Sequence, residues 1–190
     1  MDLPWGDERS IQFVTNVGLV TSDGPFGPNV SSAEWTHHVS YKPGLIMVCI
    51  KPSEATHENI AVGKEFGIHL AAEDQNVIAS VAGNTSAKKM NKIPLLQELG
   101  CVFRKAAHIK PPMLEGAVLS LECKLVEQRS MGTHTQFIGE VVEAAVTPGK
   151  APLVYHGGKY WRLGDQIHKP PQEEFDRIKT LAAKYEKVIS

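Results

Sequence analysis

One uninterrupted apolar segment places the strongest limit on what this chain can fold into. Leu45 to Ile50 is a run of six apolar residues, bounded by Pro43-Gly44 on one side and Lys51-Pro52 on the other. A short apolar run between turn residues is typical of a strand buried on both faces. It is also far shorter than the roughly 20 residues that a membrane-spanning helix requires. We therefore expect a sheet with this segment as a central strand, and no membrane span.

Further strands are predicted where residues rich in Val, Ile, Phe and Thr, or an alternating apolar pattern, lie between turn residues. The Gly- and Pro-rich stretch Ser22 to Pro28 predicts a turn between the first two strands. The last two strands are linked by a segment containing Gly132 and are expected to form an antiparallel hairpin. The predicted strands are Ser10 to Thr21, a strand that starts near Asn29, Phe66 to Ala71, Ala117 to Val126 and Gln136 to Val146.

Helices are predicted around these strands rather than in regular alternation with them. The segments Thr56 to Glu65, Asp74 to Ala82 and Ile93 to Leu99 have helical patterns or helix stop signals. From Glu173 onward, behind Pro170-Pro171, apolar residues recur at helical spacing. They are Phe175, Ile178, Leu181, Ala182, Tyr185 and Val188. The pattern predicts a mainly β fold, an antiparallel barrel with peripheral helices over residues 1–169. It also predicts an amphipathic helix in residues 170–190. We expect this helix to pack on the barrel or across a dimer through Phe175, Ile178, Leu181 and Tyr185.

Charge and cysteine usage exclude several classes of protein. Twenty Lys and Arg against 21 Asp and Glu give a net charge of −1, so no overall positive field attracts nucleic acid or an anionic membrane. Cys49, Cys101 and Cys123 are odd in number and widely spaced, which fits neither a disulfide framework nor a Cys-x-x-Cys motif. Residues 1–9 do not resemble a secretory signal. We expect a cytoplasmic protein.

Two segments that follow apolar elements combine hydroxyl groups and cations. Residues 51–57 contain Ser53, Thr56 and His57, and residues 84–89 contain Ser86, Lys88 and Lys89. Hydroxyls and helix N-terminal amides donate hydrogen bonds to a phosphate, and lysine supplies charge. Taken singly, each segment also has an ordinary interpretation, because Ser and Thr are common N-caps.

Other motifs give weaker evidence of a binding or catalytic site. Gly24-Pro25-Phe26-Gly27-Pro28 has neither the spacing of a dinucleotide-binding fold nor that of a phosphate loop. His37-His38 lacks metal-ligand spacing, because neighbours in a strand point to opposite faces. Tyr155 to Trp161 places aromatic residues around a glycine pair, which indicates either a stacking wall for a planar ligand or a hairpin that covers the core. Trp35 allows the same two interpretations.

The order and spacing of several segments resemble a known family. These segments are Gly27 to Ser32, Trp35 to Pro43, Leu45 to Lys51 and Thr56 to Ile60. Between about Ser10 and Lys169, the chain resembles the flavin reductase-like, FMN-binding split-barrel family, in particular its flavoredoxin-type branch. The resemblance implies a six-stranded antiparallel Greek-key split barrel that forms a homodimer and binds FMN near the dimer interface.

The resemblance also implies which residues bind the cofactor. Asn29, Val30, Ser31 and Ser32 would line the flavin ring, Trp35 would stack on it or wall it, and the main chain of Cys49, Ile50 and Lys51 would meet its pyrimidine edge. The ribityl phosphate would bind among Ser53, Thr56, His57, Ser86, Lys88 and Lys89, and Tyr160 belongs to an aromatic segment that covers the flavin. No catalytic acid is required, because the flavin carries the chemistry.

Three functions remain open at this stage. The first is an NAD(P)H-dependent flavin or ferric reductase, in which NADH or NADPH gives a hydride to bound FMN. The second is an FMN-containing electron carrier that is served by a protein redox partner and turns over NAD(P)H poorly. The third is a barrel that has lost its cofactor and acts as an interaction module.

Overall fold

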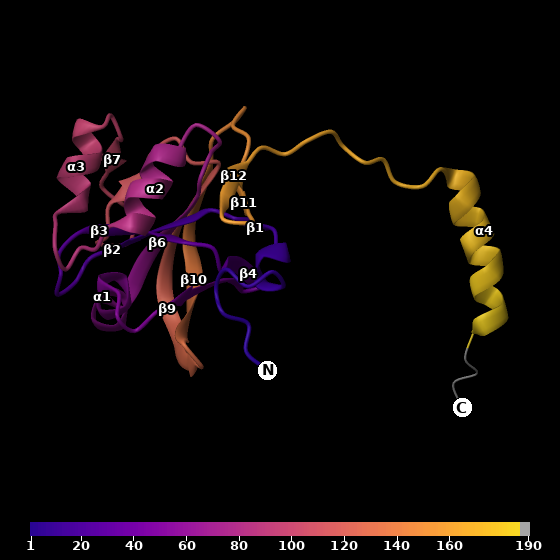
Figure 1. The fold of residues 1–190 in the computed structure, drawn as a ribbon, viewed down its shortest axis with the longest axis horizontal. Helices are drawn as coiled ribbons and strands as arrows, with labels where there is room; N and C mark the ends of the chain where they lie inside the picture. The colour runs from indigo at the N-terminus through magenta and orange to yellow at the C-terminus, as the bar shows by residue number, and fades with distance from the viewer. Residues whose placement is uncertain (187–190) are drawn as a thin grey trace.

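The computed structural model describes residues 1–186, and antiparallel strands dominate it (Figure 1). The strands are β1 (Thr15–Asn16), β2 (Gly18–Ser22), β3 (Asn29–Ala33), β4 (Thr36–Tyr41), β5 (Gly44–Ile50), β6 (Glu65–Leu70), β7 (Phe103–Arg104), β8 (Met113–Leu114), β9 (Leu119–Met131), β10 (His134–Val146), β11 (Val154–His156) and β12 (Lys159–Trp161). The helices are α1 (Ala55–Gly63), α2 (Asn76–Asn84), α3 (Lys92–Glu98) and α4 (Gln172–Ala182), with single 3₁₀ turns η1 (Ser10–Gln12) and η2 (Ala183–Tyr185).

The main sheet has seven strands in the order β3-β2-β6-β9-β10-β5-β4, and every neighbouring pair is antiparallel. Within residues 1–186 the order runs from β3 to β4 without closing on itself. The sheet encloses a core to which β2, β3, β5, β6, β9 and β10 all contribute, with Phe66 and Phe137 fully buried. The predicted mainly β split barrel with peripheral helices is confirmed, with seven strands in the main sheet rather than six, because residues 29–41 form two strands.

The apolar run that suggested a central strand has a different position from the one predicted. It forms β5, which lies between β10 and the edge strand β4. Ile46, Val48 and Ile50 are buried in the barrel core, whereas Met47 and Cys49 on the opposite face are only half-buried. The prediction of a central strand buried on both faces was therefore wrong, since the outer face of β5 lacks a full cover within the described residues.

The other predicted elements agree with the structure apart from their bounds. Only the end of the Ser10 to Thr21 segment enters the main sheet, because its first residues form η1 and the short strand β1. The β9–β10 hairpin is confirmed, and it turns at Gly132, whose φ of +58° is a backbone conformation that favours glycine.

The helices α1, α2 and α3 pack against the sheet, and in Figure 1 they lie to the left of strands β9 and β10. Ile60 of α1 packs into the barrel core. On the other face of β2, a second core joins Leu19 to Ile78 and Ala82 of α2 and to Leu96 of α3. Because Leu19 and Val20 point to opposite faces of β2, this one strand contributes to both cores.

The C-terminal helix lies away from the rest of the molecule. α4 begins at Gln172 and follows an extended segment that leads out from β12 (Figure 1). Phe175, Ile178 and Leu181 lie on it as predicted, and Val188 falls outside the described residues. No helix in residues 1–186 is both long and apolar enough to cross a membrane.

Candidate functional site

A small polar cavity of about 290 Å³ lies where β3, the start of α1 and the loop between α2 and α3 meet. The two segments that sequence analysis singled out for hydroxyls and cations both line it, although about 30 residues separate them along the chain. The lining residues are Asn29, Ser31, Ser32, Ser53, Glu54, Ala55, Thr56, Gly83, Thr85, Ser86, Ala87 and Lys92. Six predicted site residues are therefore brought together: Asn29, Ser31, Ser32, Ser53, Thr56 and Ser86.

Asn29 and Thr56 form the buried side of this cavity. The Asn29 Nδ2 atom donates a hydrogen bond of 2.8 Å to Thr56 Oγ1, and both residues are almost fully buried. The Oδ1 atom of Asn29 is buried and has no partner among the described residues. A buried amide oxygen without a partner is unfavourable, so the cavity offers an unused acceptor to a ligand that carries a hydroxyl or N–H group.

The mouth of the cavity is fixed by contacts between its two loops. Lys88 Nζ donates a hydrogen bond of 2.7 Å to the carbonyl of Ser53, and it lies 5.3 Å from the centre of the Phe26 ring. Ser31 Oγ donates to Glu54 Oε2 at 3.3 Å. Lys89 lines an adjoining hollow rather than this cavity. Lys88 therefore connects the loop that precedes α1 to the loop that follows α2.

His57 ties α1 to the barrel wall. Its Nε2 atom lies 2.8 Å from Thr135 Oγ1, and its ring meets the edge of Phe137. Burial lowers the pKa of His57, with a smaller lowering from the charge of Lys88 and an opposing effect from Glu58. Burial therefore disfavours the protonated imidazole, and the ring faces β10 rather than the cavity lining.

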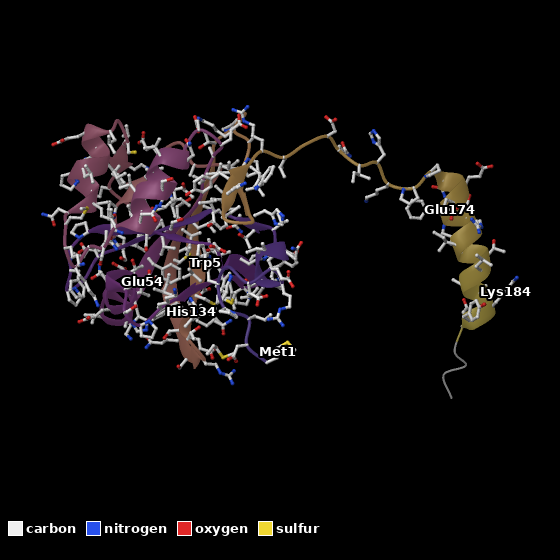
Figure 2. The ribbon with its side chains drawn as sticks, in the orientation of Figure 1. Met1, Trp5, Glu54, His134, Glu174 and Lys184 are labelled. Atoms are coloured by element: carbon white, nitrogen blue, oxygen red, sulfur yellow. The ribbon has the colours of Figure 1, made fainter. Side chains whose placement is uncertain are left out.

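A second group of predicted residues lies at the start of β10. The Trp35 ring is half-exposed and packs on the His134 ring at a centroid distance of 4.5 Å. Burial lowers the pKa of His134 and raises that of Glu34, and the charge of Lys51 acts on both groups. Figure 2 labels Glu54 of the cavity and His134 of this second group, both in the body of the molecule. Trp35 and Lys51 thus form a separate aromatic and cationic surface.

The side chains of three predicted site residues pack into or against the two hydrophobic cores. Val30 and Ile50 are buried in the two cores, so only their main chain is available to a ligand. Tyr160 packs against the second core beside Tyr155, and its hydroxyl accepts a hydrogen bond of 3.4 Å from Ser80 Oγ. Cys49 is half-buried on the outer face of β5, and burial raises its pKa.

Sequence reasoning missed three polar residues of the cavity: Glu54, Thr85 and Lys92. Glu54 and Thr85 belong to the two segments already singled out, so their position beside Ser53 and Ser86 was an available signal. Lys92 had no such signal, because nothing in the residues around it distinguishes it from an exposed lysine. Apart from the Glu54 carboxylate, the polar lining combines hydroxyls, the amide of Asn29, the N-terminus of α1 and one lysine, a set that suits an anionic group carried on a hydroxylated chain.

Comparison with known proteins shows the family of the chain. The family model described as "Flavin reductase like domain" matches residues 10–164. The reductase component of a 4-nitrophenol 4-monooxygenase/4-nitrocatechol 2-monooxygenase from Rhodococcus opacus is 29% identical over 153 residues, which cover 78% of this chain and 74% of that protein. The FMN reductase (NADH) SmoA of Agrobacterium fabrum is 27% identical over 154 residues, which cover 81% of this chain and 82% of that protein.

A solved structure shares the fold over nearly the whole chain. Flavoredoxin from Methanosarcina acetivorans has a TM-score of 0.74 at 22% identity, and the match covers 89% of this chain and 95% of that one. The family model spans both cores, the cavity and the Trp35 surface. The chain therefore belongs to the family of flavin reductase-like domains.

Proposed function

We propose that this protein binds FMN and acts as an NAD(P)H-dependent flavin reductase. The observation that carries the proposal is the cavity in which the two hydroxyl-rich loops meet at the N-terminus of α1. The family to which the chain belongs supports it, and so does the name of the Agrobacterium fabrum relative, FMN reductase (NADH).

The residues present fit such a cofactor. Ser53, Thr56 and Ser86, together with the first-turn amides of α1, would hold the phosphate. The unpartnered Oδ1 of Asn29 would accept a hydrogen bond from a hydroxyl of the ribityl chain. Trp35 would stack on the ring or wall it, and Lys51 supplies positive charge at the same surface. When bound, the flavin accepts a hydride and passes electrons on.

The protein's own contribution is position and electrostatics. Lys88 holds the two loops together, so the hydroxyls that line the cavity are arranged before a ligand arrives. The charge of Lys51 lowers the pKa of both Glu34 and His134, so this positive charge lies close to the residues beside Trp35. An anionic ligand would be stabilised there, because opposite charges attract more strongly where water is partly excluded.

We also propose that two copies pair and that the reduced flavin serves a separate acceptor protein. The half-buried outer face of β5 supports a homodimer, because a partner copy would complete its burial. The Rhodococcus opacus relative is named as the reductase component of a monooxygenase, which supports a protein acceptor. The three free cysteines are compatible with a cytoplasmic location.

An absorbance experiment tests the function. The purified protein is mixed with FMN, separated from free flavin and then titrated anaerobically with NADH and NADPH. We expect flavin bands that bleach rapidly with at least one nucleotide. Bands that bleach with dithionite but with neither nucleotide would instead identify an electron carrier, and a protein that binds no flavin would overturn both functions.

A further inference from the structure

Lys92 is buried, whereas most lysines lie exposed on the protein surface. It is the first residue of α3, and only 2% of its surface is exposed. Its Nζ atom donates hydrogen bonds to the carbonyl oxygens of Val30 in β3, at 2.9 Å, and of Ala82 in α2, at 3.0 Å. A buried charge is unfavourable unless it is hydrogen-bonded and paired, so this arrangement requires an explanation.

The ammonium group has one donor left over. A lysine ammonium has three N–H donors, and the hydrogen bonds found for Nζ within residues 1–186 use two of them. Lys92 also lines the polar cavity. Since the two carbonyls fix Nζ from β3 and from α2, the third donor is available to a group inside the cavity.

The charge balance of the cavity depends on this residue. Among the lining residues that the structure describes, Lys92 is the one cation and Glu54 the one anion. Lys88, which sequence analysis favoured, bonds the Ser53 carbonyl with its ammonium and is exposed. Without Lys92 the lining would be left with the Glu54 carboxylate alone, which would repel an anion.

Protonation supports a charged Lys92. Burial lowers its pKa to about 8, and the carboxylate of Glu54 opposes that effect. The side chain therefore remains mainly an ammonium at neutral pH, and an anion in the cavity would favour the charged form further.

We propose that Lys92 binds the phosphate of the bound flavin and makes the site select phosphorylated flavins over riboflavin. The two carbonyl bonds hold its Nζ in place, and the third donor and the positive charge act on the phosphate. This inference rests on the proposed function, and it adds to that function the residue that distinguishes FMN from its uncharged precursor.

The test compares two flavins that differ only in the phosphate. Dissociation constants for FMN and riboflavin are measured by flavin fluorescence with the unaltered protein and with Lys92→Met. We expect Lys92→Met to weaken FMN binding by about tenfold to a hundredfold, the range for a charge-assisted hydrogen bond. Riboflavin binding should change by less than about threefold, because riboflavin has no charge for the ammonium to act on.

A second variant changes the charge of the same cavity in the opposite direction, because it removes a negative charge instead of a positive one. Glu54→Gln keeps an acceptor for Ser31 but removes the negative charge that faces Lys92. It should tighten FMN binding severalfold and leave riboflavin binding unchanged. Because it leaves Lys92 in place, this variant tests the charge balance even where Lys92→Met does not fold.

The outcomes separate the two proposals. If Lys92→Met weakens the binding of FMN and of riboflavin equally, Lys92 only holds β3 and α2 together. If the substitution leaves FMN binding unchanged, Lys92 is not part of the binding site. Either result, or FMN binding that Glu54→Gln fails to tighten, overturns the inference while flavin binding by the unaltered protein still stands. A failure of the unaltered protein to bind either flavin would overturn the proposed function itself.

Discussion

At the scale of single residues, one buried histidine couples the stability of the fold to pH. His69 in β6 is fully buried; its Nδ1 atom lies 3.0 Å from Ser120 Oγ, and its Nε2 atom accepts from the Leu114 amide at 3.4 Å. Burial lowers its pKa to about 3, with a smaller contribution from the charge of Arg104. The folded protein therefore keeps this imidazole neutral over most of the acidic range.

The consequence for stability has a definite sign. Below the ordinary histidine pKa of about 6.5, the unfolded chain takes up a proton that the folded chain does not. The free energy of unfolding should be fully retained above that pH and should fall by up to about 1.4 kcal/mol per pH unit as the pH drops toward 3. Urea denaturation at several pH values, with the slope compared between the unaltered protein and His69→Gln, measures this. A slope that the substitution leaves unchanged would contradict the assignment.

Part of the candidate site could be predicted from the sequence. Ser53 and Ser86 were predicted because hydroxyl groups and helix N-terminal amides suit a phosphate, whereas Asn29 was predicted only from the family resemblance, as a residue that lines the flavin ring. Lys92 was missed, because its burial results from packing between β3, α2 and α3, and no local pattern in the sequence encodes that packing. A buried cation is a tertiary property, and such residues become visible only in the fold.

At the scale of elements, the local pattern predicted strands and helices better than it predicted their neighbours. The strand at Leu45 to Ile50 was correct in type and nearly in bounds, but its position beside the edge strand β4 depends on pairings with residues far along the chain. The apolar outer face of β5 misled the prediction, because a continuous apolar run does not reveal whether its second face is covered by the same chain. The β9–β10 hairpin was predicted well, since its pairing is local.

The contact between the two cavity loops gives a prediction at this scale. Lys88 and Lys89 are neighbours in sequence, but only Lys88 bonds the Ser53 carbonyl, whereas Lys89 faces the adjoining hollow. We expect Lys88→Met to weaken FMN binding by about tenfold or more, because it removes a charge-assisted hydrogen bond that fixes the loop. Lys89→Met is the matched control and should change the affinity by less than about twofold. Equal effects of the two substitutions in a fluorescence titration would show that general positive charge, not the loop contact, matters.

At the scale of the whole molecule, the C-terminal helix α4 has an apolar side that no other part of the described chain covers. Figure 2 shows Glu174 and Lys184 on a segment well apart from the barrel. Phe175, Ile178, Leu181 and Tyr185 are between 38% and 81% exposed, so the apolar side of this helix has no cover in its own chain as described. Isolated helices shorter than about 12–15 residues are marginal in water, and α4 has 11 residues. A partner surface would supply the burial that the helix lacks.

We predict that this surface belongs to a second copy of the chain. Deleting the residues beyond Pro171 should weaken self-association at least tenfold, because it removes a row of apolar side chains from the interface. Sedimentation equilibrium over a dilution series measures the change, and the thermal midpoint of the truncated chain shows whether the barrel remains folded. Leu181→Ser should reproduce part of the loss, whereas Arg177→Ser, a change to a charged side chain of the same helix, should not. If the truncated chain keeps both the self-association constant and the thermal midpoint of the unaltered protein, α4 packs neither across a dimer nor on its own barrel.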